Sequence, residues 1–160
     1  MQHRIRSAGI LLSGSKILML KVKDFSGDYW ILPGGGFEAG DRSTKHSLER
    51  EFEEETGLVV EVGPLVCVRE FLETSQNRYN AEFFYCITDY SGELTLSNLQ
   101  GLNDEEFIQS VQWVELSELK DKRIYPHDLA TTVMDIIKSK RFSTHLGSFV
   151  QGNADSHNQL

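Results

Sequence analysis

The chain has 160 residues, of which 39% are hydrophobic and 25% are charged, and its formal net charge at pH 7 is −8. This length and composition predict one globular domain with a hydrophobic core of its own. The negative charge argues against a general nucleic-acid-binding surface, which would have to be basic. Because no apolar run approaches the roughly 20 residues of a membrane-spanning helix and no secretory leader is recognisable, we expect a cytoplasmic protein that does not bind membranes.

The first two strands are predicted at residues 4–12 and 16–22, joined by a hairpin at 13–15 that contains a glycine. Arg4 and Arg6 are two residues apart and therefore share one face of the first strand. Either side chain could reach a substrate phosphate, whereas a solvated sheet edge is the alternative role for both.

A turn-rich segment at 24–28 leads to Tyr29 and Trp30 and then to a glycine turn at 33–36. The two aromatic rings could stack on a base beside the glycine turn, or they could pack in the core. Glycines in the turn allow the backbone to approach a ligand closely.

A helix is predicted from about Ser43 to Thr56, ended by Gly57, since a glycine readily accepts the left-handed conformation that terminates a helix. At about 100° per residue, Leu48 and Phe52 mark the apolar stripe of this helix. The stripe predicts that the helix packs on the core along this face.

Three glutamates of the helix, Glu51, Glu54 and Glu55, form one arc that begins beside this apolar stripe. Like charges at about 4 Å repel by on the order of 4 kcal/mol at an effective dielectric of about 20. Arg50 can pair with Glu54, four residues further on, but one arginine cannot neutralise three glutamates. A hard divalent cation that prefers oxygen ligands can, and Mg²⁺ usually keeps substrate phosphates among its ligands, so this arc predicts phosphate chemistry. A plain solvated acidic face is the alternative.

Further strands are predicted at 59–70, with a break at Gly63-Pro64, at 81–88, at 93–96 and at 111–114. Near the turn between the first two of these strands, Arg69, Arg78 and Tyr79 are candidates for substrate contacts. The loop at 98–107 is acidic.

A second helix is predicted to begin at Pro126, preceded by a short helical turn at 116–119, because Leu129, Val133, Ile136 and Ile137 recur at helical spacing. From Phe142 onward the sequence is polar and without periodicity, which favours an irregular extension in which Phe142, Leu146 and Phe149 could dock onto the body or a second subunit. Cys67 and Cys86 form no C-x-x-C pair, so buried free thiols are expected instead of a zinc site.

The residues from the glycine turn to the end of the acidic helix resemble the signature of the Nudix hydrolases, G-x5-E-x7-R-E-U-x-E-E-x-G-U, in which U is a bulky aliphatic or similar residue. The run R-E-F-E-E-E-T-G-L at 50–58 matches the second half of the signature at every fixed position. The first half departs from it: counting back from Arg50 puts Arg42 at the first glutamate, whereas aligning on Gly35 puts Asp41 there. We prefer Asp41, which keeps a carboxylate, and in the family this first acid is mainly a structural brace.

The order of elements suggests an α+β fold in which a mixed β-sheet lies between helices. The resemblance sharpens this expectation to the α/β/α sandwich of the Nudix family, over residues 1–141, with a polar C-terminal extension at 142–160. It implies hydrolysis of a diphosphate linkage in a nucleoside diphosphate derivative or a nucleoside triphosphate, by attack of a water that Mg²⁺ activates, with Mn²⁺ as a substitute.

The resemblance also implies roles for particular residues and leaves two other functions open. The expected metal ligands are Glu51, Glu54, Glu55 and Gly35; the expected catalytic residues are Arg50 and the same three glutamates; and the expected substrate-binding residues are Arg4, Arg6, Arg69 and Glu105. In the family a glutamate outside the signature often supplies a further metal ligand or the general base, and Glu105 and Glu106 are the candidates for it, with plain surface acids as the alternative. A non-catalytic nucleotide-binding regulatory module of the same fold is one alternative, and a structural protein with an acidic helix and no ligand is the other. The partner is expected to be a small-molecule nucleotide, and the chain could also form a homodimer.

Overall fold

The computed structural model describes residues 1–146, 149–151 and 157–159 of the chain. In chain order its strands and helices are β1 (Gln2–Ile10), β2 (Leu12–Ser13), β3 (Lys16–Asp24), β4 (Gly27–Ile31), β5 (Gly34–Gly36), α1 (Thr44–Thr56), β6 (Val59–Glu73), β7 (Arg78–Ser91), β8 (Ile108–Glu115), β9 (Ile124–Tyr125), α2 (Thr132–Ser139), β10 (Phe149–Gln151) and β11 (His157–Gln159). Short 3-10 turns lie at Thr74–Gln76, Ser97–Leu99, Leu116–Asp121 and His127–Ala130.

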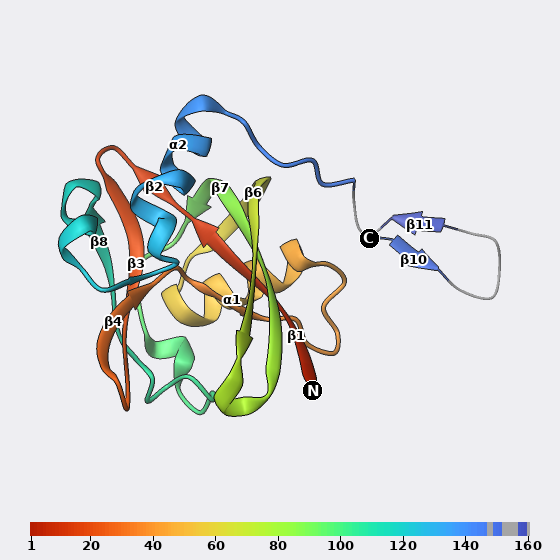
Figure 1. Ribbon diagram of the computed structural model, residues 1–160, viewed down its shortest axis with the longest axis horizontal. Helices are drawn as coiled ribbons and strands as arrows, with labels where there is room; N and C mark the ends of the chain where they lie inside the picture. Colours follow the sequence, from red (N-terminus) through yellow and green to blue (C-terminus); the bar gives the residue numbers. More distant parts are fainter. Residues whose placement is uncertain (147–148, 152–156, 160) are drawn as a thin grey trace.

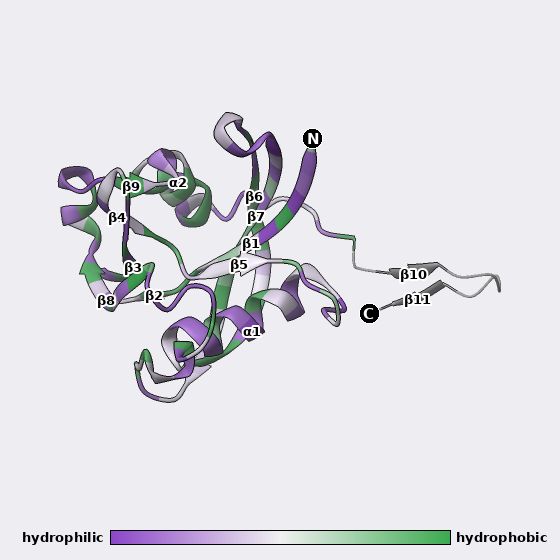
Figure 2. Cartoon of the chain, turned by 90° about the horizontal axis from the view of Figure 1, so that it is seen from below, coloured by the Kyte–Doolittle hydropathy of each residue, from purple (hydrophilic) through white to green (hydrophobic). Residues whose placement is uncertain are grey.

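Two sheets form the body of the protein (Figure 1). The first has the strand order β5-β1-β7-β6, in which β1 runs parallel to β7 and antiparallel to β5. The second has the order β2-β3-β4-β9, and β8 also pairs with β3. Helices α1 and α2 lie on opposite sides of the strands (Figure 2). The predicted class, α+β with mixed strands flanked by helices, is therefore confirmed, with two sheets instead of one.

The hydrophobic cores lie on the two sides of the strands because strand side chains alternate between the faces. On β3, Ile17 and Met19 join the core beneath α2, while Leu18 joins the core beneath α1. Leu48 and Phe52 of α1 are fully buried in the second of these cores, as the apolar stripe predicted.

Helix α1 has the ends that its sequence predicts. The Ser43 hydroxyl accepts a hydrogen bond from the His46 N–H at 3.1 Å, which satisfies one of the free donors of the first turn. Gly57 ends the helix in the left-handed conformation, with φ 78°, and its N–H donates to the Glu53 carbonyl at 3.1 Å. These two caps fix which turn of the helix carries the three glutamates.

Three local expectations need correction or refinement. The segment at 93–96 is not a strand, because the Thr95 N–H donates to the Thr56 carbonyl at the end of α1 instead of pairing within a sheet. Residues 127–130 form a 3-10 turn, and α2 begins only at Thr132, since the Thr131 backbone is not helical. The break predicted in β6 at Gly63-Pro64 is confirmed by a register shift between Val62 and Leu65.

The C-terminal extension is partly described. Phe142 packs against the core beneath α2, as expected, whereas Leu146 is 85% exposed. An irregular extension was expected, but β10 and β11 pair as antiparallel strands. Residues 147–148, 152–156 and 160 lie outside the described part, as does the Phe149 side chain, so the expected docking of Phe149 is untested.

Two further observations concern the described residues only. Cys67 and Cys86 are free thiols, as predicted, but each is half-buried instead of fully buried. Burial raises the pKa of Cys86 to about 11. No helix in the described ranges is both long and apolar enough to cross a membrane.

Candidate active site

Two of the three arc glutamates of α1 are buried. Glu55 is 3% exposed and its Oε2 accepts the Gly34 N–H at 2.7 Å, while burial raises the pKa of its carboxyl well above the ordinary value. Glu51 is 5% exposed, and burial raises its pKa to about 6 against the opposing effect of Arg50. Glu54 is half-exposed. The folded chain thus holds carboxyl groups where their charged forms are poorly solvated.

Arg50 is the centre of a hydrogen-bond network that joins these carboxylates to the glycine turn. Its Nη1 donates to Glu51 Oε1 at 2.9 Å and to Glu54 Oε2 at 3.2 Å. Its Nη2 donates to the Gly36 carbonyl at 3.1 Å and to Asp41 Oδ2 at 3.0 Å. The hydrogen bonding of Arg50 to the Asp41 carboxylate, which accepts, is the largest of the effects that raise the pKa of Arg50, so this guanidinium stays charged. Arg50 therefore fixes the orientation of Glu51 and Glu54.

Of the two residues that could occupy the first acidic position of the signature, Asp41 belongs to this network and Arg42 does not. The Asp41 side chain is only 3% exposed and accepts hydrogen bonds from Arg50 and from the Glu38 N–H. Burial opposes ionisation of Asp41, but the Arg50 hydrogen bond and the others it accepts outweigh burial and lower its pKa. Arg42 is exposed. The alignment that places Asp41 at the first acidic position of the signature is the one the fold supports.

The glycine turn is built so that α1 can pack closely on it. Gly34 has φ 146°, and a Cβ there would collide with the backbone of Ser7 and Ala8 in β1. A Cβ at Gly35 would collide with the carboxyl group of Glu51. Side chains are thus excluded at both positions, at Gly34 by the neighbouring strand and at Gly35 by a glutamate of the helix.

An acidic cavity of about 140 Å³ opens beside Arg50. Its lining residues are Glu38, Arg50, Glu51, Glu54, Leu99, Leu102, Asn103 and Asp104. Glu38 and Asp104 were not predicted, because they come from two loops whose direction the sequence does not encode. Glu105, which was predicted, is turned toward its own loop, where its Oε2 accepts the Gly101 N–H at 2.8 Å.

The donor set of this cavity suits a hard divalent cation, although the ligands are not gathered for one. Within the described ranges, no three His, Cys, Asp or Glu side chains converge closely enough to hold a metal ion as they stand. Instead Arg50 Nη1 supplies the positive charge between Glu51 and Glu54. The metal-ligating atoms that line the cavity are nevertheless carboxylate and amide oxygens, and Glu55 Oε1, outside the cavity lining, has no hydrogen-bond donor among the described residues. The residues therefore fit Mg²⁺ or Mn²⁺ once Arg50 Nη1 yields its place.

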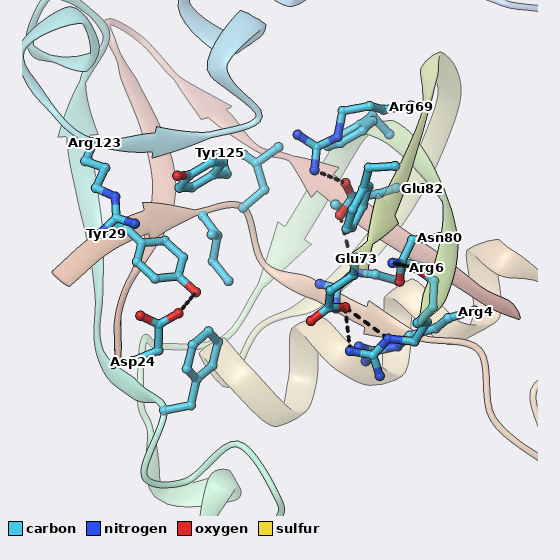
Figure 3. Close-up of a pocket in the computed structure, with 17 residues that line it drawn as sticks. Arg4, Arg6, Asp24, Tyr29, Arg69, Glu73, Asn80, Glu82, Arg123 and Tyr125 are labelled. Atoms are coloured by element: carbon cyan, nitrogen blue, oxygen red, sulfur yellow. Dashed lines mark hydrogen bonds and ion pairs between the residues drawn. The ribbon is translucent and has the colours of Figure 1, made fainter. Parts of the chain in front are cut away.

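A second and larger cleft, of about 340 Å³, lies between the two sheets (Figure 3). One wall comes from β1, β6 and β7 and carries Arg4, Arg6, Arg69, Phe71, Glu73, Arg78, Asn80 and Glu82. The facing wall carries Asp24, Tyr29, Phe107, Arg123 and Tyr125. The cleft is large enough for a small organic ligand, and it joins charged groups to aromatic rings as ligand sites commonly do.

The aromatic wall is held by contacts among its own residues. Tyr29 and Tyr125 meet edge to face with ring centroids 5.4 Å apart, and the Arg123 guanidinium lies 5.0 Å from the Tyr29 ring centroid. The Tyr29 hydroxyl donates to Asp24 Oδ2 at 3.0 Å. Tyr29 thus lines the cleft and also packs against a small core that contains Leu20 and Val22, while Trp30 packs against the core beneath α2. A ring inserted between the walls would meet π-faces and a cation together.

Of the predicted substrate-binding residues, Arg4, Arg6 and Arg69 share this cleft, and Glu105 does not line it. Arg78 also lines the cleft, whereas Tyr79 points to the opposite face of the sheet and is 37% exposed. The alternation of side chains along a strand predicts that Arg4 and Arg6 share one face of β1. It does not predict that Arg123 and Tyr125 lie across the cleft from them.

The arrangement has counterparts among known proteins. A model of the NUDIX domain family matches residues 3–132. This chain belongs to the Nudix family.

Individual proteins are similar to this chain in sequence or in fold. Over 122 residues the chain is 26% identical to the uncharacterized Nudix hydrolase YvcI of Bacillus subtilis (strain 168), covering 74% of this chain and 70% of that protein. The solution structure of the E. coli ORF135 protein superposes with a TM-score of 0.68 at 24% identity, covering 88% of this chain and 94% of the other. A structure from a study of MutT from Aliivibrio salmonicida and Vibrio cholerae gives a TM-score of 0.60 at 26% identity, and the match covers 86% of this chain and 99% of the other.

Membership of the Nudix family supports a hydrolase that acts on small-molecule substrates, and Nudix hydrolases generally use divalent metal ions. In this chain the family signature corresponds to the glycine turn and α1. The acidic cavity and the cleft lie on either side of that turn, which makes these two spaces the candidate site.

Proposed function

We propose that this chain hydrolyses the diphosphate linkage of a nucleoside diphosphate derivative or a nucleoside triphosphate, with Mg²⁺ as the metal and Mn²⁺ as a substitute. The observation that carries the proposal is the pair of spaces flanking Gly36. On one side buried carboxylates lie around Arg50, and on the other side arginines line a cleft with aromatic walls. A diphosphate that spans Gly36 would join the two spaces.

Glu51, Glu54 and Glu55, with the carbonyl of Gly35, would hold the metal. When bound, the metal would neutralise charge on the phosphoryl oxygens and lower the pKa of a water. Glu55 is fixed by the Gly34 N–H, and Glu54 stays accessible at the cavity. Arg50 would keep its Nη2 hydrogen bonds to Gly36 and Asp41 if its Nη1 made way for the metal, so its side chain would stay anchored beside Glu51 and Glu54.

A carboxylate of the acidic cavity, Glu51 or Asp104, would accept the proton of the attacking water. In the metal-free protein, burial raises the pKa of Glu51 to about 6. Asp104 stands across the same cavity on a separate loop and replaces Glu105 as the loop acid of the mechanism.

The test is chromatographic detection of the nucleotide products formed from a panel of compounds at fixed Mg²⁺ concentration, because cleavage of a diphosphate linkage between two organic groups releases two organic phosphates and no inorganic phosphate. The panel contains ADP-ribose, a dinucleoside polyphosphate, nucleotide sugars and nucleoside triphosphates, including oxidised ones. Hydrolysis of at least one compound that stops on addition of EDTA and resumes with Mg²⁺ is the expected result. Binding of these compounds without any hydrolysis would instead support the alternative, a nucleotide-binding regulatory module of the same fold.

A further inference from the structure

Arg4 differs from the other arginines of its wall in having no carboxylate partner among the described residues. Arg6 Nε donates to Glu82 Oε1 at 3.3 Å, and Arg69 Nη2 lies 3.3 Å from Glu82 Oε2. Arg78 donates through Nε and Nη2 to Glu73 Oε2, at 3.1 and 2.7 Å. Arg4 is half-buried and makes no such contact within the part of the chain that the structure describes.

The β-sheet aims all four guanidinium groups into the cleft. In the register of β1 on β7, Arg4 stands beside Asn80 and Arg6 beside Glu82, and in that of β7 on β6, Arg69 also stands beside Glu82. Side chains at these positions share one face, whereas the intervening Ile5 is 47% exposed on the other. β1 lies between β5 and β7 at Arg6–Ala8, whereas at Arg4 it pairs with β7 alone, and the Arg4 side chain lines the cleft.

This wall carries more positive charge than its own carboxylates neutralise. Four guanidinium groups face two carboxylates, Glu73 and Glu82, in a chain whose net charge is −8. Each guanidinium has five N–H donors, and the salt bridges use at most two on any of them. The carboxylates therefore hold Arg6, Arg69 and Arg78 in place while most of their donors remain available to an anion.

Arg4 stands where the cleft approaches the acidic cavity. A Cβ built on Gly36 would lie 3.0 Å from Arg4 Nε, and the Gly36 carbonyl accepts from Arg50. Burial and then the like charges of Arg6 and Arg78 lower the pKa of Arg4, while Asp104 and Glu51 of the acidic cavity act in the opposite direction. Arg4 is thus a cation without a carboxylate partner among the described residues, and it lies between the other three arginines of its wall and the carboxylates beyond Gly36.

We propose that Arg4, supported by Arg6 and Arg78, forms a phosphate subsite that works without a metal and binds the phosphate attached to the organic group of the substrate. The organic group then lies in the cleft against Tyr29 and Phe107, and the rest of the diphosphate crosses Gly36 toward the carboxylates. This orientation rests on the proposed function, whereas phosphate binding at Arg4 does not. It follows that a nucleoside monophosphate, the product that keeps this phosphate, should bind in the absence of metal.

Calorimetric titration with 5′-AMP, GMP, CMP and UMP in the presence of EDTA tests the subsite directly. At least one monophosphate should bind the unaltered protein, and Arg4→Gln should weaken that binding at least about tenfold, equivalent to about 1.4 kcal/mol. Arg4→Lys should fall between the two, because an ammonium keeps the charge but not the planar fork of donors. The control is Arg141→Gln, an exposed arginine beyond α2, which should bind like the unaltered protein.

Titration with inorganic phosphate and with the free nucleoside separates the two parts of the ligand. Phosphate binding should depend on Arg4 and weaken as salt is added, whereas nucleoside binding should be unchanged in Arg4→Gln. Circular dichroism of each variant shows whether it is folded. If Arg4→Gln does not fold, Arg4→Lys carries the comparison, and equal affinity in Arg4→Lys and the unaltered protein would then overturn the role of the guanidinium.

The subsite and the hydrolase proposal fail in different ways. Monophosphate affinity and KM that are the same in Arg4→Gln and the unaltered protein would overturn the subsite, even if the protein hydrolyses its substrate with Mg²⁺. Metal-free binding that depends on Arg4, in a protein that hydrolyses nothing, would uphold the subsite and overturn the hydrolase.

Discussion

A Cβ on Gly35 would occupy the space that the Glu51 carboxyl group fills, so this glycine and this glutamate can stand together only because one of them has no side chain. The contact joins the middle of the glycine turn to the buried face of α1. It makes the position of Glu51 sensitive to a change of one methyl group outside the helix.

Gly35→Ala should therefore reduce turnover by about 100-fold or more, since displacing a reacting group by about 1 Å can cost that much. The backbone at Gly35 is not in the left-handed region, so the fold should tolerate alanine better there than at Gly34, where φ is 146° and β1 is in the way. Steady-state rates and thermal unfolding of both variants check this. Equal losses of stability in Gly34→Ala and Gly35→Ala would contradict it.

Glu54→Gln should nearly abolish turnover and leave the fold intact. Glu54 lines the acidic cavity and is half-exposed, so the amide can be accommodated but cannot supply a negative ligand. The matched control is Glu53→Gln, one residue earlier on the exposed side of α1, which should keep its rate. Rates at saturating Mg²⁺ are compared, and a Glu54→Gln enzyme as fast as the unaltered one would remove Glu54 from the proposed role.

Asp41→Asn should destabilise the protein by about 1.5–3 kcal/mol, because it replaces the charged acceptor of two Arg50 hydrogen bonds with a neutral one. Turnover should also fall, since Arg50 orients Glu51 and Glu54. Urea unfolding with and without the substitution gives the stability difference. Arg42→Gln is the neighbouring control, and a larger effect there would restore the other alignment of the signature.

Glu51 should make the metal-free protein less stable as the pH rises. The folded state binds the Glu51 proton with a pKa of about 6, against the ordinary value of 4.5, so its contribution to stability is present below about pH 4.5 and is lost as the pH rises through about 6. The full difference amounts to about 2 kcal/mol. In EDTA, the melting temperature of Glu51→Gln should therefore rise relative to that of the unaltered protein between pH 4.5 and 7. A constant difference across this range would show that Glu51 titrates at its ordinary pKa.

The parts of the fold that the sequence predicted are those governed by local periodicity. Ser43 and Gly57 cap α1 as expected, Leu48 and Phe52 are buried, and Gly63-Pro64 breaks β6. The prediction of a strand at 93–96 was wrong because the Thr95 N–H donates to the Thr56 carbonyl at the end of α1, a contact that the local sequence pattern does not encode.

The candidate site was predictable to the same extent. The helix periodicity gave the arc of Glu51, Glu54 and Glu55, and the two-residue spacing of Arg4 and Arg6 put both on one face. Asp104 was missed in favour of Glu105 because a loop has no period that fixes which of two adjacent acids turns inward. In the aromatic wall, Tyr29 was singled out from the sequence but Tyr125 was not. Tyr125 lies beside Tyr29 because β4 pairs with β9, a contact between residues distant in sequence.

Strand β1 serves two purposes along its length, because its first half forms a wall of the cleft while its second half pairs with the glycine turn, Arg6 with Gly36 and Ala8 with Gly34. Adding one residue between Arg6 and Ser7 would send both arginines to the outer surface and leave the pairing of the later residues untouched. In the proposed site, the length of β1 before Ser7 therefore sets whether the arginines face the cleft, independently of the helix proposed to hold the metal.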